Sequence, residues 1–118
     1  CPECGKPLTL GVLYRVEQLA TREEGIKPKT AAPFTSLIPL KEIIGEVNSV
    51  GPNSKKVAGH YEALLEKFGP ELIVLQHTDL EDLKKYDTKL SQALSNLRQD
   101  KVTRQAGYDG EFGVIKTL

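Results

Sequence analysis

The chain has 118 residues, of which 39% are hydrophobic and 27% charged, with 16 acidic and 16 basic side chains. These values are ordinary for a single globular domain. The zero formal net charge argues against a protein that coats nucleic acid through a strongly basic surface. No apolar run approaches the length of a membrane span. The sequence contains no methionine, so we expect it to be part of a longer protein.

The chain opens with CPECGK, in which Cys1 and Cys4 have the spacing of a zinc knuckle. Two thiolates at this spacing can bind one tetrahedral zinc ion, because Gly5 lets the chain fold back. A structural zinc site takes four ligands, and the sequence holds no other cysteine. We therefore expect residues 1–10 to supply half of a structural site whose other cysteine pair precedes Cys1.

Three other interpretations of this pair remain open: an unpaired fragment of a zinc ribbon, a redox-active pair, or two cysteines without a role. A thioredoxin-like pair would stand at a helix N-terminus inside a βαβ pattern, which the sequence does not show. Two cysteines in a chain without signs of secretion favour a reduced compartment, and we expect a cytoplasmic protein.

Residues 8–10 could form a short strand that leads out of the knuckle. The segment GVLYRVEQLA then predicts a helix, because its apolar residues recur at helical spacing: Val12, Val16 and Leu19. Residues 21–34 are polar, lack periodicity and contain Gly25, Pro28 and Pro33, so a loop or linker is expected. Residues 11–34 are thus read as one helix followed by a long connection.

From Pro39 onward the patterns are helical almost to the end, and residues 35–118 are expected to form one helical domain. The first helix carries an apolar face of Leu40, Ile43, Ile44 and Val47. Either Asn53 or Ser54 can cap the second, which ends at Gly69. Its stripe is Val57, Tyr61, Leu64, Leu65 and Phe68.

The segment ELIVLQ fits either a strand or a buried helical turn. The capping-box spacing of Thr78 and Glu81 predicts a short helix with Leu80 and Leu83 inward. Asp87 can cap another helix; its expected inward residues are Leu90, Ala93, Leu94 and Leu97, and its expected outward residues are Lys89, Asn96 and Arg98. The tail AGYDGEFGVIKTL predicts a loop that ends in a strand.

The glycine-containing turn and the capped helix that begins with Lys55 and Lys56 are similar to the hairpin of a helix-hairpin-helix element, here residues 40–69. In such an element, backbone N–H groups at the helix start bind a DNA phosphate and nearby lysines add positive charge. Ser54, Lys55 and Lys56 are therefore candidate phosphate contacts. The alternative is a solvated helix N-terminus with two exposed lysines.

The tail segment GYDGEFG offers two flat side chains, Tyr108 and Phe112, that could stack on a base. We name Tyr108 as the candidate stacking residue. In the alternative interpretation both aromatic residues pack into the helical core and the glycines shape the return to the final strand. The carboxylates of Asp109 and Glu111 would repel phosphate if they were exposed.

The sequence shows no nucleophile with an adjacent base, no phosphate-binding loop of the Walker type and no HExxH motif. The two histidines, His60 and His77, have no acidic or histidine partner at metal-ligand spacing, so neither is expected to bind metal. We expect no catalytic residues in this chain and no activity from it alone.

Four stretches in this order resemble the C-terminal part of endonuclease Q-like proteins of the PHP (polymerase and histidinol phosphatase) superfamily. They are CPECGKPLTLGVLYRVEQLATREEG, APFTSLIPLKEIIGEV, the SKKV helix and GYDGEFGVI. The resemblance implies an N-terminal metal-dependent PHP domain, then a four-cysteine zinc element and a helical C-terminal region. The implied activity is DNA cleavage 5′ to uracil, hypoxanthine or an abasic site. Cys1 and Cys4 match zinc ligands of that family, whereas its catalytic residues have no counterpart here.

The expected fold is therefore mainly α, with half of a zinc knuckle at the N-terminus and a short strand at the C-terminus. The expected function is a non-catalytic module that binds DNA through its phosphate backbone, beside the PHP domain of the same protein. The alternative is a structural or protein-interaction domain that packs on that catalytic domain without touching DNA. A freestanding enzyme is the weakest hypothesis, because the sequence shows no catalytic constellation.

Overall fold

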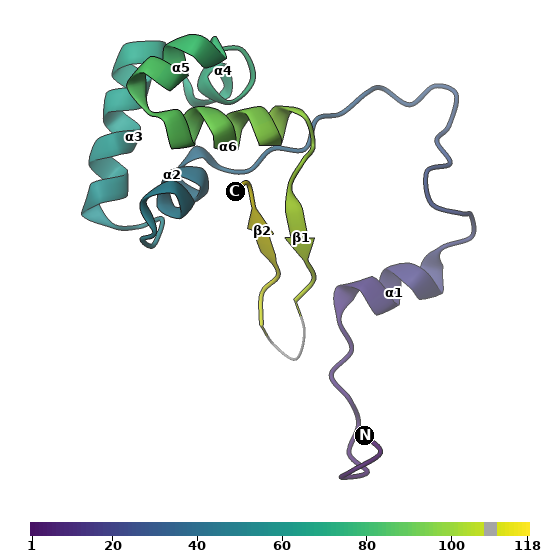
Figure 1. Ribbon diagram of the computed structural model, residues 1–118. Coiled ribbons are helices and arrows are strands. Elements are labelled where there is room, and N and C mark those ends of the chain that lie inside the picture. Colours follow the sequence, from purple (N-terminus) through teal and green to yellow (C-terminus); the bar gives the residue numbers. More distant parts are fainter. Residues whose placement is uncertain (108–110) are drawn as a thin grey trace. The chain divides into compact units, whose positions relative to one another are not determined.

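The computed structural model describes residues 1–107 and 111–118. Within these residues the protein is mainly helical, with one small antiparallel sheet (Figure 1). The expected mainly α class is thus confirmed. The elements are α1 (Val12–Leu19), α2 (Leu40–Asn48), α3 (Lys55–Phe68), α4 (Glu71–Gln76), α5 (Leu80–Tyr86), α6 (Thr88–Arg98), β1 (Thr103–Gln105) and β2 (Val114–Lys116).

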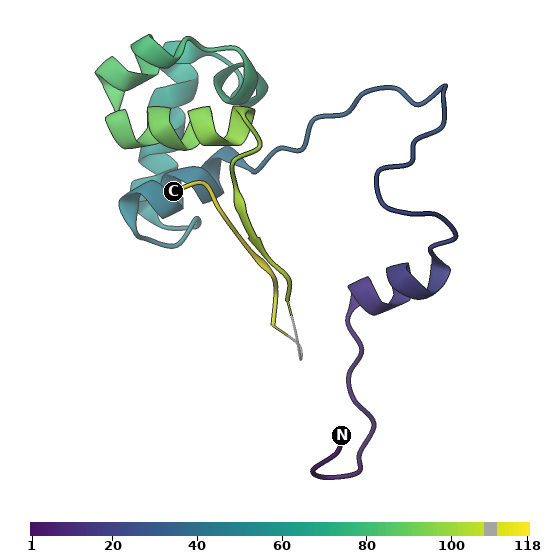
Figure 2. The same cartoon turned by 45° about the vertical axis from the view of Figure 1, so that its right-hand side comes forward.

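The chain divides into two compact units, which are described separately. One comprises Cys1–Thr35 and Gln105–Val114, and the other comprises Ser36–Arg104 and Ile115–Leu118. Helices α2 to α6 belong to the second unit, here called the helical unit (Figures 1 and 2). No helix in the described part of the chain is long and apolar enough to cross a membrane.

The helical unit is built around one hydrophobic core to which all five of its helices contribute. The inward faces predicted for α2 and α6 are confirmed, since every residue named there is buried. In α3 two residues of the predicted stripe are fully buried and the other three pack against the core. The buried residues are Leu40, Ile43, Ile44, Val47, Val57, Leu64, Val74, Leu75, Leu83, Leu90, Ala93, Leu94 and Leu97.

Helix α2 ends in a tight turn that brings its backbone against the start of the next segment. Ser49 adopts a left-handed conformation with φ of 54°, and Val50 N–H donates to the carbonyl of Gly45 at 3.0 Å. A Cβ atom on Gly45 would lie 2.8 Å from the carbonyl oxygen of Val50 and 3.3 Å from the nitrogen of Pro52. The turn therefore requires a residue without a side chain at position 45.

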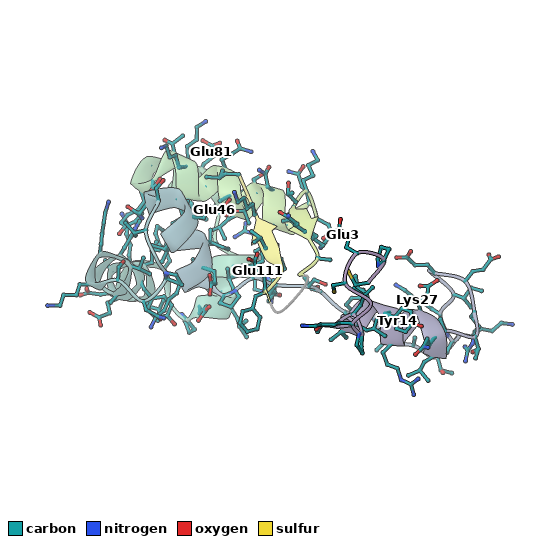
Figure 3. The ribbon with its side chains drawn as sticks, turned by 90° about the horizontal axis from the view of Figure 1, so that it is seen from below. Glu3, Tyr14, Lys27, Glu46, Glu81 and Glu111 are labelled. Atoms are coloured by element: carbon teal, nitrogen blue, oxygen red, sulfur yellow. The ribbon has the colours of Figure 1, made fainter. Side chains whose placement is uncertain are left out.

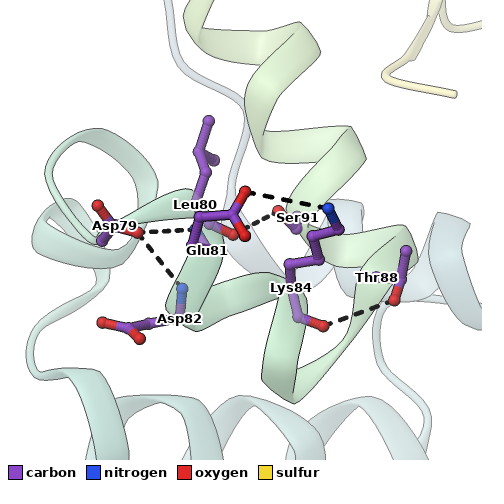
Figure 4. A network of polar contacts seen from close by, with 7 residues as sticks. All are labelled: Asp79, Leu80, Glu81, Asp82, Lys84, Thr88 and Ser91. Carbon is purple, nitrogen blue, oxygen red and sulfur yellow. Dashed lines mark hydrogen bonds and ion pairs between the residues drawn. The ribbon is translucent and has the colours of Figure 1, made fainter.

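Three helices begin at side-chain caps, and one of them differs from the prediction. Ser54 and Asp87 cap α3 and α6 as expected. The cap of α5 is Asp79 rather than Thr78: its carboxylate accepts hydrogen bonds from the N–H groups of Glu81 and Asp82 (Figure 4). Thr78 instead donates its hydroxyl to the carbonyl of Ile73 and so belongs to the end of α4.

Two side chains join helices that are distant in the sequence. The Glu71 carboxylate accepts hydrogen bonds from the backbone N–H of Leu40 at 2.8 Å and from the Tyr61 hydroxyl at 2.9 Å. Helix α2 has no side-chain cap of its own, so Glu71 provides an acceptor for its first backbone N–H group. Arg98 donates to the carbonyls of Leu75 and Val74 at the end of α4. The outward orientation predicted for Arg98 is therefore wrong, because its guanidinium satisfies helix-end carbonyls.

The C-terminal strand is confirmed as β2, and it pairs with a second strand, β1, that was not predicted. The segment ELIVLQ forms helix α4, so the helical interpretation of this segment is confirmed and the strand interpretation is wrong.

The prediction of a strand at residues 8–10 is wrong, because these residues are exposed and lie in no strand. In the other unit α1 occupies the predicted segment, but no residue of this helix is buried.

Glu46 of α2 holds the end of the chain segment that follows β2 (Figure 3). Its carboxylate accepts hydrogen bonds from the Thr117 hydroxyl at 2.6 Å, from the Thr117 N–H and from the Leu118 N–H. Asn96 of α6 donates to the carbonyl of Thr117 at 2.6 Å. Burial by itself raises the pKa of Glu46, but the hydrogen bonds from Thr117 and Leu118 and the charge of Lys116 lower it overall.

The close approach at Gly45 predicts that Gly45→Ala lowers the free energy of unfolding by about 1–3 kcal/mol, because an added methyl group forces the turn away from α2. Gly59→Ala is the matched control: it also lies inside a helix, but its Cβ would meet nothing within 4 Å. We expect that control to stabilise the protein by about 0.5–1 kcal/mol through helix propensity. Urea denaturation measures both changes, and equal effects of the two substitutions would contradict the packing described here.

The lowered pKa of Glu46 predicts a dependence of stability on acid pH. The folded-state pKa lies below the ordinary value of 4.5, so the stabilisation is fully present above that value and is lost as pH falls through the folded-state pKa. At neutral pH, Glu46→Gln should lower the free energy of unfolding by about 1–2 kcal/mol, a figure reduced because the carboxylate is half-exposed. The difference from the wild type should shrink towards zero at acid pH, once the pH lies below the folded-state pKa.

Denaturation of both proteins at the two pH values measures this dependence. Glu42→Gln serves as the control, since Glu42 is an exposed carboxylate on the same helix. A difference between the wild type and Glu46→Gln that persists unchanged at acid pH would show that the carboxylate charge is not what holds Thr117.

Candidate nucleic-acid interface

Three of the candidate contact residues lie together at the start of α3. Lys55 and Lys56 are the first two residues of the helix and are exposed, and Ser54 is its half-buried cap. The Ser54 hydroxyl oxygen accepts a hydrogen bond from the N–H of Val57 at 3.3 Å. The preceding turn is closed by a hydrogen bond from Ser54 N–H to the carbonyl of Gly51. The structure thus brings the predicted residues to one helix N-terminus.

The electrostatics of this helix N-terminus favour an anion. The first amide groups of an α-helix have no acceptor within the helix, and the helix dipole places partial positive charge there. Helix α3 has 14 residues and no acidic residue in its first turn. Lys55 and Lys56 add two positive charges at a position where the dipole disfavours them, unless an anion is bound.

Further lysines of the helical unit lie over aromatic rings. Lys41 Nζ is 5.0 Å from the centre of the Tyr61 ring, and Lys67 Nζ is 4.9 Å from the centre of the Tyr86 ring. The hydrogen bond from Tyr61 to Glu71, together with burial and the charge of that carboxylate, raises the pKa of Tyr61. Tyr61 therefore remains a hydroxyl donor at neutral pH. The sequence alone did not reveal these two lysine–tyrosine pairs, because each joins residues of two different helices.

The two candidate metal ligands, Cys1 and Cys4, lie in a turn that folds the chain back on itself. Gly5 has φ of +68°, and its N–H donates to the carbonyl of Cys1 at 2.9 Å. Both cysteines are exposed and unpaired with each other. No group of three or more His, Cys, Asp or Glu side chains that could hold a metal ion occurs among residues 1–107 and 111–118. Two thiol groups three residues apart are a donor type that zinc takes, and they would supply two of the four ligands of a tetrahedral site.

The candidate stacking residue, Tyr108, lies outside the described residues. The other aromatic residue of GYDGEFG, Phe112, is described and has 96% of its surface exposed. The alternative in which Phe112 packs into the helical core is therefore wrong. The sequence already marked Phe112 as a flat side chain in a glycine-rich segment, but gave no means of choosing between exposure and burial.

The two histidines occupy ordinary structural positions. His60 is half-buried, with its Nδ1 atom 3.3 Å from the Asn48 side-chain nitrogen and its ring 5.6 Å from the Tyr86 ring. His77 is exposed just after α4. Neither belongs to a group of three or more potential metal ligands within the described part of the chain.

The family model described as the MJ0043 C-terminal domain matches residues 39–101 of this chain, which include α2 to α6. A curated protein of Methanocaldococcus jannaschii, the uncharacterized protein MJ0043, is 35% identical over 115 residues. That alignment covers 98% of this chain and 14% of the relative.

Two solved structures are also similar to the whole chain. The lesion-specific endonuclease PfuEndoQ from Pyrococcus furiosus matches with a TM-score of 0.82 and 34% identity, over 98% of this chain and 28% of that protein. Endonuclease Q in complex with a 27-mer duplex substrate, with an abasic lesion at the active site, matches with a TM-score of 0.79 and 33% identity. The match covers 98% of this chain and 29% of that one. The chain thus spans less than a third of either protein.

Proposed function

The chain belongs to the MJ0043 C-terminal domain family, and from that premise we propose that it is a DNA-engaging module of a DNA-repair endonuclease. Its role is to hold duplex DNA that contains a deaminated base or an abasic site. Catalysis takes place in a metal-dependent domain of the PHP superfamily in the same protein. The module itself contributes position and orientation rather than bond cleavage.

The observation that carries this proposal is the start of α3, where two exposed lysines and a capped helix N-terminus coincide. A DNA phosphate can accept hydrogen bonds from the amides of the first turn, while Lys55 and Lys56 each neutralise the charge of a nearby phosphate. The similarity to a protein solved with duplex DNA supports the choice of DNA over other polyanions. Such contacts fix the register of the duplex without reading its sequence.

The geometry of the preceding turn supports a preformed site. The close approach of α2 at Gly45 and the cap at Ser54 fix the direction in which α3 begins. We infer that helices α2 and α3, joined by a short glycine-containing turn, act as the helix-hairpin-helix-like element, residues 40–69, that the sequence suggested. When a phosphate binds to a preformed site, no conformational entropy is lost in ordering the protein backbone.

The zinc-knuckle turn has a supporting role in the same proposal. Cys1 and Cys4 supply two thiolate ligands to a structural zinc ion in the reducing cytoplasm, and the ion would fix the chain immediately before α1. The other ligands come from outside the described residues of this chain. Gly5, with its positive φ, allows the tight turn that follows the two cysteines.

A second candidate function is a structural module that packs on the catalytic domain and has no direct contact with DNA. The specific observation in its favour is the uncovered apolar side of α1. Four of its hydrophobic residues are more than half exposed: Val12, Leu13, Val16 and Leu19. Such a face usually packs against another protein surface.

The proposal predicts that this chain binds labelled duplex DNA with an affinity that falls steeply as salt rises. Lys55→Ala/Lys56→Ala should weaken binding and lower the slope of log affinity against log salt by about 2, because each phosphate contact contributes about 0.9 to that slope. Fluorescence anisotropy at several salt concentrations measures the slope for each variant.

Two further variants separate charge from folding. Lys84→Ala/Lys85→Ala removes the same charge from two exposed lysines at the end of α5 and should leave the slope nearly unchanged. Ser54→Asp preserves the helix cap, because Asp and Ser are equally good caps, but places a carboxylate beside the phosphate and should weaken binding. If the chain does not bind duplex DNA at low salt, or if the Lys55/Lys56 and Lys84/Lys85 pairs have equal effects, the proposal is wrong.

The zinc proposal predicts that added Co²⁺ produces the near-ultraviolet charge-transfer absorption of thiolate ligands. Because one chain supplies two of four ligands, saturation should occur at about one metal ion per two chains. Cys1→Ser/Cys4→Ser should abolish the absorption while the helical circular dichroism remains unchanged. If the wild-type chain, kept reduced, shows no thiolate absorption with added Co²⁺, the zinc proposal is wrong.

A further inference from the structure

A single large aromatic side chain is almost completely exposed beside strand β2. Phe112 has 96% of its surface accessible and lies two residues before Val114, where β2 begins. Single exposed apolar residues are common on protein surfaces, so exposure alone does not assign a role. The ring of Phe112 nevertheless presents a flat surface of the size of a base.

The backbone near Phe112 leaves the ring no place to fold between the two chain segments. A Cβ atom on Gly107 would collide with the carbonyl oxygen of Glu111, and one on Gly113 would lie 2.8 Å from the carbonyl oxygen of Gln105. The backbones therefore meet directly at the two glycines, which adopt positions that only residues without a side chain can occupy. This contact keeps the ring outside the paired segments.

The strand that follows Phe112 is anchored. Strand β2 pairs with β1, and the next residue, Thr117, is 2% exposed. Thr117 is bound by the Glu46 carboxylate and by the Asn96 side chain. Phe112 is thus followed in the chain by a paired strand rather than by a free tail.

The charge beside the ring indicates which part of DNA it can contact. Glu111 is exposed and adjacent to Phe112, and its carboxylate disfavours a position against phosphate (Figure 3). The ring itself can stack on base faces, a contact that does not depend on sequence. Apolar side chains also insert between base steps, but only after the bases are unstacked.

From these observations we propose that Phe112 inserts into the base stack of damaged duplex DNA, in the gap that a missing base leaves. An intact stack must first be opened at a cost in free energy, whereas an abasic site already contains a space of one ring. The insertion therefore gives the module a preference for the lesion. This inference rests on the proposed function, because it requires that the chain binds duplex DNA.

Phe112→Trp tests the insertion directly, because the sequence contains no other tryptophan. We expect the emission of this tryptophan to be quenched when an abasic duplex is added, and to change little with the matched intact duplex. Phe34→Trp is the control, since Phe34 is 77% exposed in a different segment and should show no quenching with either duplex.

Phe112→Ala tests the energetic consequence. It should lower affinity for the abasic duplex by at least about tenfold, while affinity for the intact duplex and the salt dependence remain unchanged. Phe112→Tyr should retain the preference. The side chain at this position is exposed, so its replacement should not disturb packing, and circular dichroism checks that each variant is folded.

The outcomes separate this inference from the proposed function. The wild type could bind in a salt-dependent way while the fluorescence of Phe112→Trp is not quenched, or while Phe112→Ala loses equal affinity for both duplexes. Either result would overturn the insertion without contradicting the phosphate contacts. Absence of binding to either duplex by the wild type would overturn both. Quenching on the abasic duplex alone, with a selective loss in Phe112→Ala, would support the insertion.

Discussion

The absence of a side chain at Gly45 is the constraint on which the candidate interface depends. At this position the backbone of α2 touches the turn at Val50 and Pro52, so the direction in which α3 begins is set by backbone contact. The next residue, Glu46, holds Thr117 at the end of the segment that follows β2. Two consecutive residues of one helix thus position both the start of α3 and the anchored strand.

The two proposed DNA contacts use different physical forces. Lys55 and Lys56 act through charge, which salt screens and which does not distinguish a damaged duplex from an intact one. Phe112 acts through stacking, which depends little on salt and requires a space between bases. A module that combines them would bind duplex DNA generally and remain longer at a lesion, so affinity and selectivity would come from separate residues.

Much of the helical unit could be predicted from the sequence, because apolar residues at helical spacing mark the buried faces of α2, α3 and α6. Local signals failed where neighbouring residues compete, as at Thr78 and Asp79, where two good capping residues stand side by side. They also failed for Arg98 and Glu71, whose partners lie on distant helices. Strand β1 has the polar sequence TRQ, without alternation that would mark it. The position of Ser54, Lys55 and Lys56 at the start of α3 could be predicted because helix-start chemistry is local.

The most direct test of the central claim is a two-dimensional NMR titration of the amide groups with an abasic duplex. If α3 begins at a phosphate, the amides of Ser54, Lys55, Lys56 and Val57 should show the largest chemical-shift changes, and these should diminish as salt is added. If those amides do not shift while the duplex binds elsewhere, or if no amide shifts at low salt, the start of α3 is not a DNA contact.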